Sequence, residues 1–205
     1  AVAQRDLEIR GAGNLLGGAQ SGHVEGVGFD LYVRMVSDAV AAYRGDAPTE
    51  KADVRMDLQV DAHIPEGYVR GERLRLEVYA KIAATTTPEQ EKDVREELVD
   101  RYGPIPPQVD LLFAVARLRE TVRRVGITEI VTQGKYLRVS PVELRDSQVM
   151  RLKRLHPGTV IKAAVRQVLV PLPLTSRVGG SPLTDGPLLE WVETLVTKIL
   201  VPFGE

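Results

Sequence analysis

The glycine-rich stretch between residues 11 and 28 constrains the fold of this chain more than any other feature of its sequence. It contains Gly11, Gly13, Gly17, Gly18, Gly22, Gly26 and Gly28. Glycine loses more conformational freedom on folding than other residues, so such density indicates unusual backbone angles or a close approach to another molecule. The side chains around it that are best suited to gripping phosphate or sugar are those of Arg5, Arg10 and Gln20.

Several interpretations of these glycines compete. A Walker A loop requires Gly-x-x-x-x-Gly-Lys-Ser/Thr, and the stretch has no Lys after a glycine. A dinucleotide-binding fingerprint requires Gly-x-Gly-x-x-Gly, and Gly11 to Gly17 is one residue too long. Asp30 lies near the offset of a ribose-binding carboxylate, but the later glycines leave no room for a crossover helix. Another alternative is that the glycine-rich stretch is a surface loop without a functional role.

The motif itself points elsewhere. Arg5-Asp-Leu-Glu-Ile-Arg-Gly-Ala-Gly-Asn-Leu-Leu-Gly17, followed by Gln20-Ser-Gly, resembles the TRG motif shared by RecG and the bacterial transcription-repair coupling factors. The resemblance implies a helical hairpin and loop at the edge of a second RecA-like motor domain, which couples ATP hydrolysis to movement along double-stranded DNA. It implies coupling and DNA-tracking roles for Arg10 and Gln20, with Arg5 beside them. Gly11, Gly13 and Gly17 would shape the loop.

Composition sets limits on the other classes of function. The net charge is −1, with 43% hydrophobic and 27% charged residues, so any DNA contact must be local rather than the effect of a basic field. There is no cysteine, and three scattered histidines do not make a metal site. No apolar run approaches the roughly 20 residues of a membrane span. We therefore expect a cytoplasmic chain without membrane contact, and the start at Ala1 suggests a part of a longer protein.

Periodicity predicts the elements along the chain. Residues 29–44 have the apolar spacing of a helix, and Gly45 ends it. Residues 53–64 alternate between apolar and polar, as in a strand with one wet face. Further helices are expected over residues 70–84, 88–102, 108–125, 146–155 and 188–201, with a hairpin over 127–139 and one or two strands over 159–170.

These elements predict the fold class and two domains. Residues 1–45 form the glycine-rich arm and linker helix, at the end of the motor domain that the TRG resemblance implies. Residues 46–205 form an α/β domain that is mostly helical, with a small and mostly antiparallel sheet. The second domain shows no nucleophile–base pair, carboxylate pair or metal cluster, which favours a binding or regulatory role.

A second resemblance covers this domain. Arg75-Leu-x-x-Tyr79-x-Lys-Ile-Ala83 and Glu97-Leu-Val-Asp-Arg-Tyr-Gly-Pro-Ile-Pro106 follow the first strand. That order is similar to the carboxy-terminal domain of the transcription-repair coupling factor (Mfd) family, which RecG lacks. Members displace RNA polymerase stalled at DNA lesions, using ATP and magnesium, and recruit UvrA for nucleotide excision repair.

The resemblance also implies what this domain does. In the family it clamps onto the protein's own UvrB-like amino-terminal module and hides the UvrA-binding surface. The segment around Glu97, Asp100 and Arg101 resembles the clamp contact, so these three are the candidate docking residues. No catalytic residue or cofactor is expected within this chain, because ATP and magnesium would bind elsewhere in the parent enzyme.

One alternative of another class stays open. The chain could be a stand-alone nucleic-acid-binding regulator that uses its glycine-rich arm and the basic turns at residues 117–124 and 151–154. The balanced net charge weighs against it.

Overall fold

The computed structural model describes residues 54–201, which divide into two compact units. Residues 61–117 form one, the helical unit, and residues 54–60 with 118–201 form the other, the sheet unit. The predicted arm, the helix over 29–44 and the boundary near residue 45 lie outside the described residues.

The helical unit is built from α3 (Glu72–Ala83), α4 (Pro88–Tyr102) and the first part of α5 (Pro107–Arg124). Helix α4 begins where the sequence predicts, because the Thr87 hydroxyl accepts a hydrogen bond from the Gln90 backbone N–H at 3.2 Å. The Gln90 carboxamide accepts from the Thr86 N–H at 2.8 Å instead of closing a capping box on Thr87. The helix ends at Gly103, whose φ of 89° favours glycine.

The core of this unit lies where helical spacing places it. Helices α3 and α4 bury Val78, Tyr79, Ile82 and Leu98, and α5 adds Val109, Leu112 and Phe113. Tyr79 also satisfies a buried backbone group, since its hydroxyl accepts from the Ile64 N–H at 2.8 Å.

The alternating segment over residues 53–64 is a strand for only three residues, β1 (Arg55–Asp57). Its burial nevertheless alternates from Val54 to Ile64 as predicted. The strand is short because only Arg55 to Asp57 lie beside another strand, in parallel register with Glu129 to Val131. Side-chain periodicity reports burial, whereas a strand also requires a neighbour for its backbone.

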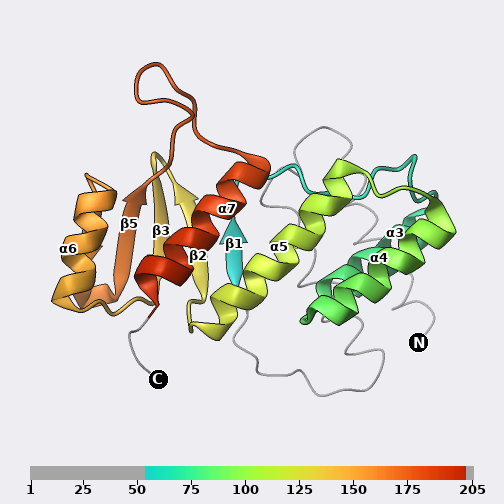
Figure 1. Cartoon of the computed structure of the whole chain (residues 1–205), viewed down its shortest axis with the longest axis horizontal. Helices are drawn as coiled ribbons and strands as arrows, with labels where there is room; N and C mark the ends of the chain where they lie inside the picture. Colours follow the sequence, from blue (N-terminus) through green and yellow to red (C-terminus); the bar gives the residue numbers. More distant parts are fainter. Residues whose placement is uncertain (1–53, 202–205) are drawn as a thin grey trace, which may run out of the picture. The chain divides into compact units, whose positions relative to one another are not determined.

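The sheet unit holds a five-stranded sheet in the order β1-β2-β3-β5-β4. Figure 1 labels the first four of these strands side by side. Its further strands are β2 (Glu129–Gln133), β3 (Tyr136–Ser140), β4 (Val160–Lys162) and β5 (Gln167–Pro171). All pairs except β1 with β2 are antiparallel. The predicted fold class, an α/β mixture with a small and mostly antiparallel sheet, is therefore confirmed.

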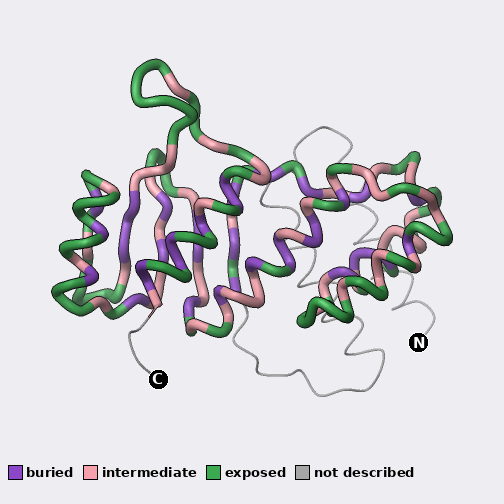
Figure 2. The backbone as a smooth tube through the Cα atoms, in the orientation of Figure 1, coloured by how far each residue is buried: buried purple, intermediate pink, exposed green. Residues whose placement is uncertain are grey.

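Besides the last part of α5, two whole helices belong to the sheet unit. They are α6 (Asp146–Leu155) and α7 (Asp185–Leu195), and α7 continues into the π-helical turn η2 (Val196–Leu200). A short 3-10 turn, η1 (Ala163–Val165), joins β4 to β5. In Figure 1, α7 crosses one face of the sheet, and Figure 2 shows buried positions along the central strands and α7.

The periodicity of α6 predicts Leu155 on its buried side, and that prediction is wrong. Leu155 is 48% exposed, whereas the polar Gln148 is only 3% exposed. The Gln148 amide donates to the carbonyl of Ile199 at 3.1 Å and to that of Val201 at 2.8 Å. The carbonyls that end η2 need donors, which an apolar side chain cannot supply.

Candidate functional site

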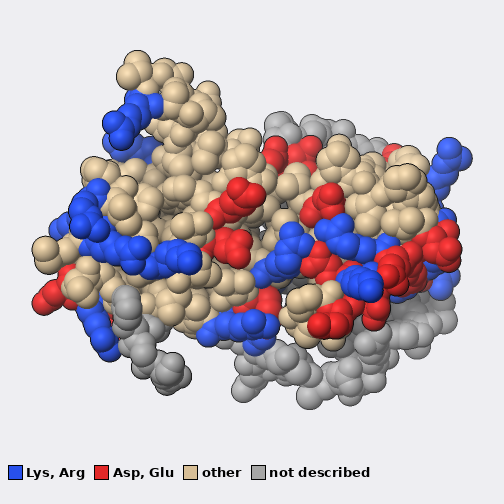
Figure 3. Space-filling model, in the orientation of Figure 1, with Lys and Arg blue, Asp and Glu red and all other residues tan. Residues whose placement is uncertain are grey.

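The candidate site is the outer side of α4 near its carboxyl end. Glu97, Asp100 and Arg101 stand there at spacings of three and four residues, so the helix brings all three to one side. Glu97 is half-buried, and Asp100 and Arg101 are exposed. Figure 3 shows acidic and basic side chains intermixed over the part of the surface where Figure 1 places α4.

The Glu97 carboxylate already forms ion pairs within the helical unit. Its carboxylate accepts from the Lys81 ammonium of α3 and, at 3.3 Å, from the Arg101 guanidinium of its own helix. The hydrogen bond from Lys81 is the main cause that lowers the pKa of Glu97, and Arg101 adds to it. Glu97 therefore ties α3 to α4 and orients Arg101.

Asp100 differs from Glu97 in its surroundings. Within residues 54–201 its carboxylate has neither a hydrogen bond nor an ion pair. Arg101 is partly satisfied by Glu97, and its guanidinium carbon lies 5.2 Å from the centre of the Tyr102 ring. This side of α4 thus presents an unpaired carboxylate beside a cation that is held in place.

The end of α4 is fixed by Tyr68. Its hydroxyl donates to the Gly103 carbonyl at 3.0 Å, and its ring meets that of Tyr102 edge-on, with centroids 5.8 Å apart. Burial raises the pKa of the Tyr68 hydroxyl, so it remains a donor at neutral pH. These contacts hold the last turn of α4, and with it Asp100 and Arg101, in one orientation.

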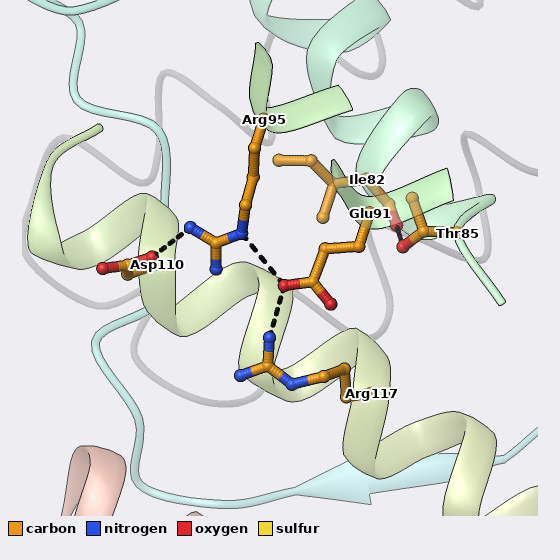
Figure 4. Close-up of polar contacts among 6 residues, drawn as sticks. All are labelled: Ile82, Thr85, Glu91, Arg95, Asp110 and Arg117. Carbon is orange, nitrogen blue, oxygen red and sulfur yellow. Dashed lines mark hydrogen bonds and ion pairs between the residues drawn. The ribbon is translucent and has the colours of Figure 1, made fainter. Parts of the chain in front are cut away.

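A second charged cluster joins α4 to α5 (Figure 4). The Glu91 carboxylate accepts from Arg95 at 3.0 Å and from Arg117, and Arg95 also reaches Asp110 at 2.5 Å. The Arg95 guanidinium carbon lies 4.3 Å from the centre of the Phe113 ring. Sequence reasoning missed this cluster, although the spacing of Glu91 and Arg95 was a signal for one of its pairs.

The described residues contain no Walker A sequence. Gly134 and Lys135 form the hairpin turn between β2 and β3, and no Walker lysine occurs among residues 54–201. The same residues contain no group of His, Cys, Asp or Glu that could hold a metal ion. None of their helices is long and apolar enough to cross a membrane. The other candidate residues, Arg5, Arg10, Gln20 and the loop glycines, lie outside the described part.

Known proteins resemble the chain over nearly its whole length. The family model of the TRCF domain matches residues 58–152, which include the α4 site. The transcription-repair-coupling factor of Mycobacterium bovis (strain ATCC BAA-935 / AF2122/97) is 46% identical over 211 residues, covering 97% of this chain and 17% of that protein. The protein of the same name from Staphylococcus aureus (strain USA300) is 37% identical over 183 residues, covering 86% of the chain and 16% of that protein. The chain belongs to the transcription-repair coupling factor family.

A solved structure gives a weaker likeness. The crystal structure of the C-terminal domain of a transcription-repair coupling factor aligns with a TM-score of 0.47 and 18% identity, over 58% of this chain and 80% of that one. The chain spans less than a fifth of the length of its relatives in the transcription-repair coupling factor family. The identities to the two curated relatives confirm the family predicted from the two sequence motifs, while the roles of individual residues stay predictions.

Proposed function

We propose that this chain supplies two parts of a transcription-repair coupling factor. Residues 1–30 provide a TRG element through which ATP hydrolysis in the parent enzyme drives movement along double-stranded DNA. The domain from residue 46 onward docks on the protein's own UvrB-like amino-terminal module and masks the UvrA-binding surface. The parent displaces stalled RNA polymerase, and unmasking then permits recruitment of UvrA.

The arrangement on α4 supports the docking role. Asp100 is exposed and lacks an ion pair with any residue in 54–201, while Glu97 and Tyr68 hold its surroundings in place. A charge presented on a rigid element loses little freedom on binding. Charged contacts at an interface set register and specificity more than affinity, which suits a contact that must open. The complementary partner surface carries a cation opposite Asp100 and a carboxylate opposite Arg101.

The coupling role rests on the motif alone. The match to the Mycobacterium bovis relative covers 97% of the chain, so the TRG resemblance lies within a family relationship that the rest of the chain supports. Arg10 and Gln20 are the proposed coupling residues, with Arg5 beside them. In this proposal, ATP and magnesium bind to other parts of the parent protein.

A binding titration tests the docking role. The chain is titrated with the UvrB-like module supplied in trans, and Asp100→Lys and Arg101→Glu are compared with wild type. Each reversal places like charges in contact, so we expect at least roughly tenfold weaker binding. Glu193→Lys is the matched control, since Glu193 is an exposed carboxylate of α7, in the sheet unit.

Glu97 requires a separate treatment because it is tied to Lys81 and Arg101. Glu97→Gln keeps the shape and removes the charge, and its unfolding midpoint is measured beside its affinity. The docking role is refuted if folded wild type does not bind the module, or if Asp100→Lys binds no more weakly than Glu193→Lys.

A further inference from the structure

The sheet unit contains a long segment without a carboxylate side chain. No Asp or Glu occurs between Asp146 and Asp185, although the chain as a whole has a net charge of −1. The cations of this segment are all exposed: Arg151, Lys153, Arg154, Lys162, Arg166 and Arg177. Figure 3 shows Lys and Arg side chains over the part of the surface where Figure 1 places α6.

The same segment exposes apolar side chains. Apart from Val99, every large hydrophobic residue that the described part exposes lies in it: Met150, Leu155, Val160, Val165, Leu174 and Val178. Met150 is 72% exposed although it is in the middle of a helix. Met150 is therefore a largely exposed apolar side chain in a segment that carries cations and no carboxylate.

Helix α6 presents both kinds of side chain on one side. Met150 stands three and four residues before Lys153 and Arg154, so the three are neighbours on its outer side. Neither cation forms an ion pair with another residue of the described part of the chain. We use "the α6 face" for Met150, Lys153 and Arg154.

The opposite side of α6 is tied to the rest of the sheet unit. Leu152 is completely buried, Gln148 holds the carbonyls of Ile199 and Val201, and Arg151 donates to the Lys198 carbonyl at 3.1 Å. These contacts fix the rotation of the helix, so the α6 face cannot turn inward to bury Met150. A surface that is already ordered loses little entropy when a partner binds.

The mixture of charge and apolar surface identifies the kind of partner. A nucleic-acid backbone is held by cations and hydrogen-bond donors, and an exposed Met adds nothing to a phosphate contact. Protein interfaces, in contrast, are enriched in Met and Arg. We propose that the α6 face binds an acidic amphipathic helix of a partner protein, with Met150 as the apolar anchor and Lys153 and Arg154 pairing with carboxylates.

This surface lies in the sheet unit and is separate in sequence from the α4 site of the helical unit. The inference therefore does not depend on the docking role proposed for α4, and either can fail while the other stands.

The test uses the whole chain and a defined probe. A fluorescein-labelled helical peptide of about 18 residues carries Leu on one face and Glu on the other, in the spacing that helix-in-groove ligands use. A scrambled peptide of the same composition and a labelled DNA duplex of about 20 base pairs are the comparison probes. Binding is measured by fluorescence anisotropy, and backbone amide shifts locate the site.

The variants separate charge from apolar contact. The double variant Lys153→Glu/Arg154→Glu should bind the peptide at least roughly thirtyfold more weakly, because two attractions become repulsions. Met150→Ser should weaken binding roughly five- to tenfold through lost apolar contact. Arg73→Glu/Lys92→Glu is the matched control: its side chains are 88% and 75% exposed on α3 and α4, and it should stay within about twofold of wild type.

Three results would overturn the proposal. Equal binding of the scrambled peptide would remove the amphipathic helix as the occupant. Tighter binding of the duplex, unaffected by Met150→Ser, would identify a phosphate-binding surface instead. A concentration-dependent rise in mass by sedimentation, lost in the Lys153→Glu/Arg154→Glu variant, would make a second copy of the chain the occupant.

Discussion

At the scale of single residues, His156 shows how position alters a side chain's chemistry. It caps the carboxyl end of α6, and its ring meets that of Trp191 edge-on, with centroids 5.3 Å apart. Burial lowers the pKa of His156 below its usual 6.5, because the charged imidazolium loses hydration there. The unfolded chain therefore binds this proton more readily than the folded chain does.

A pH dependence of stability follows from this difference. The contribution of neutral His156 is complete above about pH 6.5 and is lost as the pH falls from there through the lower folded-state pKa. Glu97 and Glu120 do not contribute to this pH dependence. Their pKa values are lowered, so the stability that they add is lost only below about pH 4.5. We expect the urea concentration at the unfolding midpoint to be lower at pH 5.5 than at pH 7.5.

The variant His156→Phe isolates the effect. It keeps an aromatic ring beside Trp191, the only tryptophan of the chain, and cannot be protonated. Its urea midpoint, followed by Trp191 fluorescence, should change less over this pH interval than that of wild type. An identical pH dependence in both proteins would show that His156 is not responsible.

At the scale of elements, the sequence predicts what depends on local periodicity and capping. The helix predicted over residues 88–102 is present as α4, and the hairpin predicted over 127–139 is present as β2 and β3. The length of β1 could not be predicted, because a strand needs a partner that the local sequence does not name. The burial of Gln148 also depends on carbonyls about fifty residues away along the chain.

The cluster around Glu91 yields a prediction at this scale. Glu91 is only 13% exposed and accepts from Arg95 and Arg117, so it joins α4 to α5. Glu91→Ala leaves both guanidinium groups without this partner and should lower the free energy of unfolding by about 1–2 kcal/mol. Urea denaturation measures the loss.

Another pair of α4 provides the control for that experiment. Glu96 meets Lys92 at 3.8 Å with both side chains largely exposed, so Glu96→Ala should cost no more than about 0.5 kcal/mol. Equal losses in the two variants would show that the Glu91 cluster contributes no more than an ordinary surface pair.

At the scale of the whole molecule, the two motifs predicted the family, and the periodicity predicted the fold class. The candidate site was predicted only in part. The sequence places Glu97, Asp100 and Arg101 together on a helix, but it does not distinguish the paired Glu97 from the unpaired Asp100. That difference depends on Lys81 of α3, which tertiary packing brings to Glu97. The pattern of charges along α4 alone cannot predict an ion pair with a residue of another helix.

The last prediction concerns catalysis by the chain as a whole. No Walker A sequence occurs anywhere in its 205 residues, and P-loop motors hold the phosphates of ATP and its magnesium ion with that sequence. We therefore expect the purified chain to release no phosphate from ATP above the buffer rate, with or without duplex DNA. The measurement is a coupled phosphate-release assay across the size-exclusion peak, with a known DNA-stimulated ATPase as positive control. Turnover that rises and falls with this chain's own peak, and that duplex DNA stimulates, would refute its assignment as a coupling and docking part of a larger motor.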